Sequence, residues 1–406
     1  MNSQDVMALL SPEVGQLIET HLDHSPTAFA LQFHGSALPI PLIASQIELL
    51  QRAKAKLPSW YASRCILTRR AFEQASSEAA QQGRPLAGGL KAADLTGGLG
   101  VDAWHLSLAY QQVDYLEADP VLCQMAEVNF RRLEAGNIAI HSARAEQFAE
   151  TLGQQGAYDL IFIDPDRRNA KGERVAAFAD CQPNVLALLP ELLNCLSPMG
   201  EILIKASPML DLTEGRRQLK RIAPWVQAEV ISVRNEVKEV LFRIRKTHPS
   251  DDEAIRCHML RTRRHSFMGT PGPPLPNSPI TEAKYIYEAD VALYKSHLVP
   301  TFFNSLPDLP GRMTHPNGYF FTDRSDLGHP AKVFHILANW PYKPKQVKRE
   351  LKSMGIKKAE VSRRHFDLPT RTVSTQLGLQ PGGEHILLCS QNDSGKRWVW
   401  LCERVQ

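Results

Sequence analysis

The chain has 406 residues, of which 43% are hydrophobic, and a formal net charge of +4. This length suffices for two to four domains, since one domain takes roughly 100–200 residues. The seven cysteines form no C-x-x-C pair, and no histidines cluster at ligand spacing, so the sequence argues against a disulfide framework and a zinc site. The N-terminus lacks a basic segment before an apolar run, and no window reaches the roughly 18 apolar residues of a membrane span. We therefore expect a cytoplasmic protein that binds neither a metal nor a membrane.

The first 82 residues are predicted to form a helical domain. Apolar residues recur at helical spacing in 14–18 and 47–50, and residues 51–56 are mostly strong helix formers. The run that starts with Arg84-Pro85 and ends in two glycines then interrupts the helical pattern.

Short apolar strands alternate with helices over residues 83–246. Strands are predicted at 91–95, 113–117, 138–141, 160–163, 201–205, 229–233 and 240–245. Helices are predicted at 101–110, 121–133, 145–152, 185–196 and 212–221. This alternation is typical of an α/β domain with a doubly wound, mostly parallel sheet that helices cover on both faces.

The most informative motif lies between the first two strands. Asp94 ends the first strand, Gly97, Gly98 and Gly100 follow it, and Glu117 closes the second strand. A strand, a glycine turn that opens a helix, and a strand ending in a carboxylate are typical of a nucleotide-binding βαβ unit. Glycine lets the backbone approach the ligand, and the acid accepts the ribose hydroxyls. We therefore expect a nucleoside-type cofactor.

Charge at this turn distinguishes two such cofactors. A dinucleotide places its pyrophosphate against the helix N-terminus, where Asp94, three residues before the glycines, would repel it. S-adenosylmethionine (SAM) has no phosphate, and it carries a sulfonium and an ammonium group that a carboxylate attracts. The motif therefore favours SAM over NAD. The alternative is a glycine turn that Asp94 or Thr96 caps and that binds no ligand.

A second motif, Asp164-Pro165-Asp166-Arg167, follows the fourth strand. Ligands of open α/β sheets lie beyond the carboxyl ends of strands near the switch point, and a fourth strand would neighbour the first. Asp164 would then face the reactive end of the cofactor. With the Pro165 carbonyl it could accept two hydrogen bonds from an exocyclic amine and align the lone pair of that amine for methyl transfer. The alternative is that Asp164 caps a loop and Pro165 ends the strand.

Two other charged features lie at the ends of later strands. Lys205, at the end of the fifth strand, could orient a phosphate or cap the sheet. Residues 235–239 lie where the last two strands join, and we expect a hairpin stabilised by opposite charges there.

The chain beyond residue 246 is expected to form small α+β domains. Residues 271–279 are dense in proline and glycine, which predicts a surface loop or linker. Residues 279–330 are predicted to be a small mixed domain, for which a ferredoxin-like arrangement is one option. Residues 331–406 are predicted to be a compact α/β unit that ends in strands at 384–389 and 398–402.

The predicted domain over 331–406 is basic. It contains 14 Lys and Arg against six Asp and Glu, a net charge of +8, which leaves −4 for the rest of the chain. Basic residues concentrated in one domain indicate binding of a polyanion. The alternative is the solvated face of an amphipathic helix over 343–358.

These motifs together resemble the bacterial class I SAM-dependent methyltransferases that carry a C-terminal THUMP-like domain. The resemblance runs from about residue 51 to the C-terminus. The Asp164-Pro165 pair is also similar to the D/N-P-P-Y/F box of nucleic-acid methyltransferases that act on amino groups. The segments that carry the resemblance are 73–78, 94–102, 162–168, 204–211, 358–366 and 377–384.

The resemblance implies a Rossmann-like class I methyltransferase domain with SAM as cofactor. Asp94, Gly97 and Gly100 would line the methionine end of SAM, and Glu117 would hold the ribose. The residues expected to bind the cofactor are Asp94, Thr96, Gly97, Gly98, Gly100, Glu117 and Ser142. Those expected to act on the substrate are Asp164, Pro165 and Arg167, and those expected to bind RNA are Lys357, Lys358, Arg363 and Arg364.

The sequence departs from the family pattern in two places. Arg167 stands where an aromatic residue normally follows the box, and Asp166 replaces the second proline; a guanidinium plane can also stack on a base. The acid that many class I enzymes carry after the third strand is missing, because Ala143 stands there, so backbone groups or Ser142 could hold the adenine.

The function expected from these features is SAM-dependent methylation of an exocyclic amine, or another base nitrogen, of rRNA or tRNA. One alternative is a noncatalytic protein that binds RNA, or helps its assembly, and keeps SAM as a structural ligand. The other is an NAD-dependent oxidoreductase.

Overall fold

The computed structural model of the chain describes residues 1–152, 157–166, 178, 181–247, 254–273, 283–325, 328–392 and 394–405. It separates into two compact units. The first comprises Met1–Glu229 and Lys238–Asp252, and the second comprises Val230–Val237 and Glu253–Gln406. No helix in the described part of the chain is long and apolar enough to cross a membrane.

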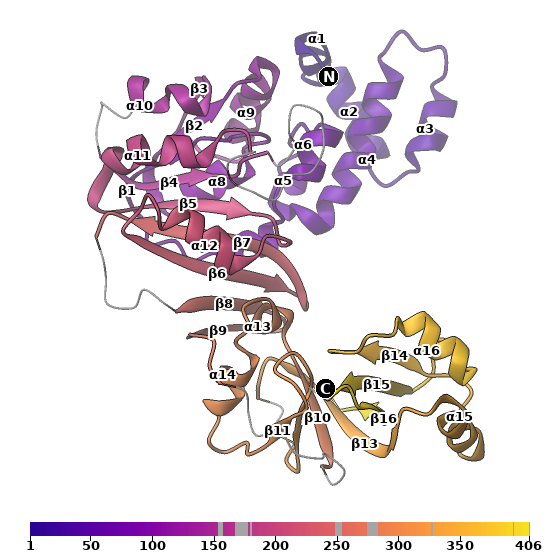
Figure 1. Ribbon diagram of the computed structural model, residues 1–406. Coiled ribbons are helices and arrows are strands. Elements are labelled where there is room, and N and C mark those ends of the chain that lie inside the picture. The colour runs from indigo at the N-terminus through magenta and orange to yellow at the C-terminus, as the bar shows by residue number, and fades with distance from the viewer. Residues whose placement is uncertain are drawn as a thin grey trace. The chain divides into compact units, whose positions relative to one another are not determined.

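The N-terminal part of the first unit is helical (Figure 1). Its apolar faces share one core with Val101 and Met125, which belong to the sheet-bearing part of the same unit. Asn129 connects the two parts through its buried side-chain amide. The amide oxygen accepts a hydrogen bond of 2.7 Å from the Ile66 N–H, and the amide nitrogen donates one of 2.9 Å to the Ile66 carbonyl. The helices are α1 (Ser3–Leu9), α2 (Pro12–His21), α3 (Pro26–Gln32), α4 (Ile40–Lys56), α5 (Pro58–Ala62), α6 (Arg69–Gln74) and α7 (Glu78–Gly83).

The sheet of the first unit has the strand order β3-β2-β1-β4-β5-β7-β6. The first five strands in this order are parallel, and β7 runs antiparallel to β5. The predicted α/β fold with a mostly parallel sheet is therefore confirmed. The strands are β1 (Gly89–Asp94), β2 (Tyr110–Glu117), β3 (Ile138–Ser142), β4 (Tyr158–Ile163), β5 (Leu196–Ala206), β6 (Trp225–Val233) and β7 (Glu236–Arg245).

Two predicted helices of this unit differ most from expectation. The helix predicted to reach residue 110 ends at Ser107, because Tyr110 already pairs with Gly89 as the first residue of β2. The helix predicted over 145–152 divides into a 3₁₀ turn and a single short helix. The helices are α8 (Val101–Ser107), α9 (Pro120–Arg132), η1 (Ala145–Gln147), α10 (Phe148–Thr151), α11 (Val185–Cys195) and α12 (Leu212–Leu219).

The predicted hairpin between the last two strands is confirmed. Arg234 and Asn235 form the connection between β6 and β7, and both have positive φ, 51° and 64°. Two successive residues with positive φ are typical of the type I′ turn, whose twist matches that of paired strands.

The second unit contains a hairpin and a seven-stranded sheet of order β11-β12-β10-β13-β16-β15-β14. The central strand β13 pairs with β10 on one side and β16 on the other. The predicted domain boundary at 331 therefore falls at the first residue of a central strand. This strand, β13, joins residues from both sides of the boundary into one sheet. The strands are β8 (Ile255–Leu260), β9 (Arg264–Gly269), β10 (Tyr285–Ala289), β11 (Arg312–Met313), β12 (Phe320–Thr322), β13 (Ala331–Pro341), β14 (Glu360–Arg363), β15 (His385–Gln391) and β16 (Arg397–Arg404).

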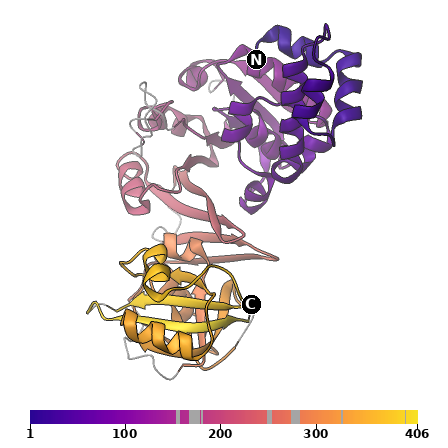
Figure 2. The same ribbon diagram turned by 90° about the vertical axis from the view of Figure 1, so that its right-hand side faces the viewer.

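Period-two alternation along β15 builds two cores in the second unit. Leu387 and Cys389 face α15 (Pro344–Ser353) and α16 (Thr370–Leu377), whereas Ile386 and Leu388 belong to the core on the other side of the sheet. The helices can be followed in Figure 2, where the C-terminal part is drawn in orange and yellow. They are α13 (Val291–Lys295), α14 (Val299–Asn304), α15 (Pro344–Ser353) and α16 (Thr370–Leu377). Most of the loop predicted at 271–279 lies outside the described residues.

Candidate cofactor and substrate site

Three of the predicted carboxylates lie at the carboxyl edge of adjacent parallel strands. Asp94 ends β1, Glu117 ends β2 and Asp164 directly follows β4, and the sheet order places β1 between β2 and β4. Thr96 connects two of these segments, because its Oγ1 accepts a hydrogen bond of 2.7 Å from the backbone N–H of Asp164. The fold thus brings both sequence motifs to one edge of the sheet, where open α/β sheets bind their ligands.

The glycine turn after β1 is closely packed against β2. A Cβ atom at Gly97 would lie 2.2 Å from the Tyr115 ring, so no other residue fits there without displacing that ring. The Tyr115 hydroxyl donates a 2.7 Å hydrogen bond to the carbonyl of Gly98. Gly100 has a φ of +91°, and a Cβ there would lie 2.7 Å from Phe130. Glycine is therefore required for both the packing and the conformation of this turn.

Glu117 is held in place by the backbone on either side of it. Its Oε2 accepts a 2.8 Å hydrogen bond from Gly98 N–H, and its Oε1 accepts one of 2.8 Å from Asp119 N–H. Each carboxylate oxygen can accept a further bond, so both could also receive a ribose hydroxyl. Ser142 is the residue paired with Glu117 in β3, and the following N–H, of Ala143, donates to the Glu117 carbonyl at 3.1 Å.

Asp94 is fully buried and only half satisfied. Its Oδ1 accepts a 3.0 Å hydrogen bond from Thr96 N–H, whereas its Oδ2 has no hydrogen-bond partner among the described residues. Burial, together with the nearby charge of Asp102, raises the pKa of Asp94 to about 8. A buried carboxylate oxygen without a partner is costly, and a cationic group of a ligand would relieve that cost. The unpartnered acceptor oxygen of Asp94 therefore fits the ammonium group of SAM.

Asp164 forms an ion pair with Lys205 from β5. Lys205 Nζ lies 2.5 Å from Asp164 Oδ2 and donates a second hydrogen bond of 2.9 Å to Ser76 Oγ. Burial lowers the pKa of the Lys205 ammonium, but Asp164, Asp102 and Glu239 outweigh burial and raise it above its ordinary value. Lys205 is therefore a buried, charged partner of the candidate catalytic acid, a role that the sequence did not indicate.

A buried polar network extends from this pair into the N-terminal helices. Ser76 Oγ donates to Glu239 at 2.8 Å, and Arg84 bridges Glu239 at 3.1 Å and Asp102 at 2.9 Å. Gln81 adds hydrogen bonds to the carbonyl of Val101 and the carboxylate of Asp102. Sequence reasoning missed these residues, and it interpreted Arg84 only as part of a helix-breaking run. The one available signal was the resemblance at 73–78.

The chain after Asp164 returns to β-structure for a single residue. Asp166 and Gln182 exchange two backbone hydrogen bonds of 2.7 and 3.0 Å, which fixes the chain just beyond Pro165. Arg167, the third residue expected to act on the substrate, lies outside the described residues. In the parts of the chain that the structure describes, no group of three or more His, Cys, Asp or Glu side chains could hold a metal ion.

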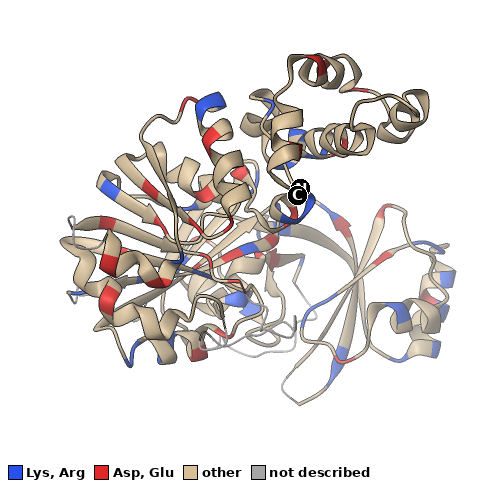
Figure 3. Cartoon of the chain, turned by 90° about the horizontal axis from the view of Figure 1, so that it is seen from above, with Lys and Arg blue, Asp and Glu red and all other residues tan. Residues whose placement is uncertain are grey.

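The four residues expected to bind RNA fall into two places of the second unit. Lys357 and Lys358 are exposed between α15 and β14, whereas Arg363 and Arg364 lie at the end of β14. Figure 3 shows basic residues gathered on α15, an amphipathic helix that buries Val347 and Leu351. Exposed charge on such a helix is compatible with polyanion binding and also with simple solvation.

Arg364 differs from Arg363 in being part of the packing. Its Nε donates a 2.9 Å hydrogen bond to Glu288, and its guanidinium lies 4.1 Å from the centre of the Tyr294 ring. We expect Arg364→Gln to lower the free energy of unfolding by about 1–3 kcal/mol, because Glu288 is buried and would lose a charge-assisted hydrogen bond. Arg363→Gln should change it by less than about 0.5 kcal/mol, as is usual at exposed positions. Urea unfolding of both variants measures the difference, and equal losses would contradict a structural role for Arg364.

Comparisons with known proteins agree with this architecture. Residues 331–404 match the family described as THUMP domain-like. The whole chain is similar to the crystal structure of a "putative methyltransferase" from Porphyromonas gingivalis W83, with 26% identity, a TM-score of 0.80 and 100% of both chains covered. No curated protein matches the chain.

Other solved methyltransferases match a smaller share of the chain. A SAM-dependent methyltransferase from Agrobacterium tumefaciens is 17% identical, with a TM-score of 0.33, and the match covers 42% of this chain and 60% of that one. A ribosomal protein L11 methylase from Lactobacillus delbrueckii subsp. bulgaricus is 19% identical, with a TM-score of 0.31, and covers 42% of this chain and 77% of that one. The chain therefore has the α/β fold of a methyltransferase and a C-terminal domain that matches the THUMP domain-like family.

Proposed function

We propose that this protein transfers a methyl group from SAM to an exocyclic amine, or another base nitrogen, of RNA. The observation that carries the proposal is the meeting of Asp94, Glu117 and Asp164 at the carboxyl edge of three adjacent strands. Asp94 suits the ammonium group of SAM and Glu117 suits its ribose. Asp164 follows the adjacent strand β4 and is next to the carbonyl of Pro165. That arrangement can position both a cofactor and an amine.

The residues around the reacting nitrogen would act mainly by orientation. When bound, SAM would supply a methyl group on a sulfonium: the nitrogen lone pair would bond to the methyl carbon in line as the C–S bond breaks, the neutral thioether would leave, and the methylated amine would lose one proton. Asp164 and the Pro165 carbonyl would accept the two N–H groups of the amine and turn its lone pair toward that methyl group. Lys205 keeps the Asp164 carboxylate ionised and fixed. Orientation of this kind can contribute roughly 7–11 kcal/mol to lowering a barrier in favourable systems.

The C-terminal residues 331–406 support RNA as the substrate. Residues 331–404 match the THUMP-like family, and residues 331–406 carry the net charge of +8. A basic domain on the same chain as a methyltransferase domain would hold a polyanionic substrate by its phosphates.

The experiment that tests the proposal has two stages. Thermal unfolding with SAM and with NAD should show a higher melting temperature with SAM only, because selective binding to the native state stabilises it. The protein should then transfer labelled methyl groups from SAM to RNA from cells that lack it, and mass spectrometry of the nucleosides would identify the product. Stabilisation by SAM without any methyl transfer would favour the noncatalytic RNA-binding alternative, and stabilisation by NAD the oxidoreductase.

Replacement of Glu117 tests the ribose assignment. We expect Glu117→Ala to weaken SAM binding by about 1.5–3 kcal/mol, the contribution of a charge-assisted hydrogen bond. Since Glu117 also accepts hydrogen bonds from Gly98 and Asp119, Glu117→Gln should retain part of the affinity. Calorimetry measures the dissociation constants, and an unchanged value in a folded Glu117→Ala variant would contradict the assignment.

A further inference from the structure

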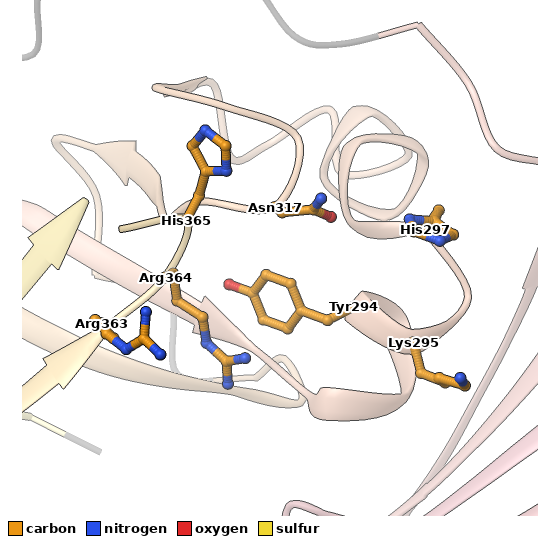
Figure 4. A pocket seen from close by; sticks show the side chains of 7 residues that line it. All are labelled: Tyr294, Lys295, His297, Asn317, Arg363, Arg364 and His365. Atoms are coloured by element: carbon orange, nitrogen blue, oxygen red, sulfur yellow. The ribbon is translucent and has the colours of Figure 1, made fainter. Parts of the chain in front are cut away.

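A cavity of about 490 Å³, wide open to solvent, lies at the surface of the second unit. Its lining comes from three segments that are distant in the sequence: α13 with the turn after it, the turn before β12, and the end of β14 (Figure 4). Lys357 and Lys358 do not line it. The lining residues are Tyr294, Lys295, His297, Asn317, Arg363, Arg364 and His365.

The lining of this cavity is cationic. It includes one lysine, two arginines and two histidines, and no lining residue is acidic. Glu288, which is not a lining residue, forms ion pairs with Arg364 at 2.9 Å and with Lys332 at 3.2 Å. The Glu288 carboxylate therefore neutralises part of the Arg364 charge. Lys295 and Arg363 add two further positive charges. A concave site lined by one sign of charge favours a ligand of the opposite sign.

The two arginines of the cavity are held in fixed positions. Arg364 lies over the ring of Tyr294, and the Tyr294 hydroxyl donates a 2.8 Å hydrogen bond to the carbonyl of Gly318. Arg363 Nη1 donates to the carbonyl of Phe366, and its other N–H groups have no partner among the described residues. Groups that are already ordered lose little freedom when a ligand binds, which increases affinity.

The groups beside the arginines suit a nucleotide. The His365 ring stacks face to face on His315, with centroids 3.4 Å apart and an angle of 2° between the planes. Imidazole rings are among the planar groups on which unpaired bases of RNA stack. Asn317, which is exposed, supplies an amide that can both donate and accept hydrogen bonds.

We propose that this cavity binds one phosphate group of the RNA substrate, with the adjoining base next to His365. The inference rests on the proposed RNA substrate and adds a defined contact point for it. Arg363, Arg364 and Lys295 would contact the phosphate oxygens. The segments before and after residue 331 would then hold the RNA jointly, since both line the cavity.

The test measures binding of fluorescently labelled bulk tRNA to the full-length protein between 50 and 200 mM salt. Arg363→Gln removes a cation, and Asn317→Asp adds a negative charge at nearly constant shape. Arg371→Gln and Asn304→Asp make the same charge changes at exposed positions of the second unit that do not line the cavity. Charge variants are preferable to truncation, because cutting the chain at residue 331 would remove β13 from its pairing with β10.

We expect Arg363→Gln to lower the slope of log affinity against log salt by about 0.7–0.9, the value for one lost phosphate contact. Asn317→Asp should weaken binding by several-fold, and the two control variants should bind within about two-fold of the wild type, as expected where no phosphate contact is lost. If the controls weaken binding as much as the cavity variants, or if the cavity variants bind normally, the inference is overturned while the proposed function stands. If the wild type itself does not bind RNA, the proposed function fails.

A competition arm separates RNA from a free nucleotide as the source of the phosphate. AMP at millimolar concentration should compete only weakly, because it offers one phosphate without the rest of the RNA. Tight AMP binding that Arg363→Gln abolishes, with unchanged affinity for tRNA, would assign the cavity to a free nucleotide and contradict the proposal.

Discussion

Replacement of Asp164 by alanine is expected to lower kcat by at least about 100-fold, comparable to the loss of one preorganised hydrogen-bonding group in other active sites. SAM affinity should remain within a few-fold, because Asp164 would contact the acceptor amine and not the cofactor. The two quantities can be separated by calorimetry with SAM and by single-turnover methyl transfer to RNA. An equal loss of SAM binding would make Asp164 a cofactor ligand, and full activity would make it a structural residue.

Lys205→Met provides the matched test of the ion pair. Without the ammonium group, the partly buried Asp164 carboxylate loses its 2.5 Å partner and its pKa should rise. The variant should therefore have low kcat at neutral pH and regain part of it as the pH increases, whereas Asp164→Ala should stay inactive at every pH. Glu191→Gln on α11, which removes an exposed carboxylate, serves as the control for both. A flat pH profile for Lys205→Met would argue that Lys205 only packs the site.

Binding of SAM is expected to become stronger as the pH rises from 6 to 8, by about tenfold between pH 6 and 7 and by less between pH 7 and 8, because one proton must be released. The pKa of Asp94 is raised to about 8 by burial and by Asp102, so this carboxyl is protonated in the free protein below that pH. An ammonium group near Oδ2 favours the ionised carboxylate. Calorimetry at pH 6, 7 and 8, in buffers of different ionisation enthalpy, measures both the affinity and the released proton.

Asp94→Asn is the control for this proton linkage. It keeps the shape of the side chain but cannot ionise, so its SAM affinity should be lower at pH 8 and nearly independent of pH. If the SAM affinity of Asp94→Asn depends on pH as strongly as that of the wild type, the released proton comes from another group. Between about pH 4 and 8, Asp94 in the unliganded native wild type keeps a proton that it has lost in the unfolded state. The free energy of unfolding should therefore fall as the pH rises through that range.

Local sequence patterns were sufficient to predict the strands and the glycine turn of the first unit, and the hairpin that joins β6 and β7. Each depends on neighbouring residues: strands on short apolar runs, the turn on Gly97 and Gly100, and the hairpin on a two-residue connection at Arg234 and Asn235. Asp94, Glu117 and Asp164 could be placed at one edge because parallel strands with helical crossovers end on the same side. The sequence by itself therefore determined the α/β fold and the three candidate carboxylates.

Only the tertiary structure decided the partners of those carboxylates and the cavity of the second unit. Ser76 and Glu239 are 163 positions apart in the chain, and Lys205 and Asp164 are 41 apart. Their contacts therefore cannot be predicted from local sequence patterns. The same holds for Arg364 and Tyr294, which lie 4.1 Å apart and come from segments on either side of residue 331. A buried polar residue is indistinguishable in sequence from an exposed one until packing supplies its partner, because the cost of desolvation depends on the fold and not on the neighbouring residues.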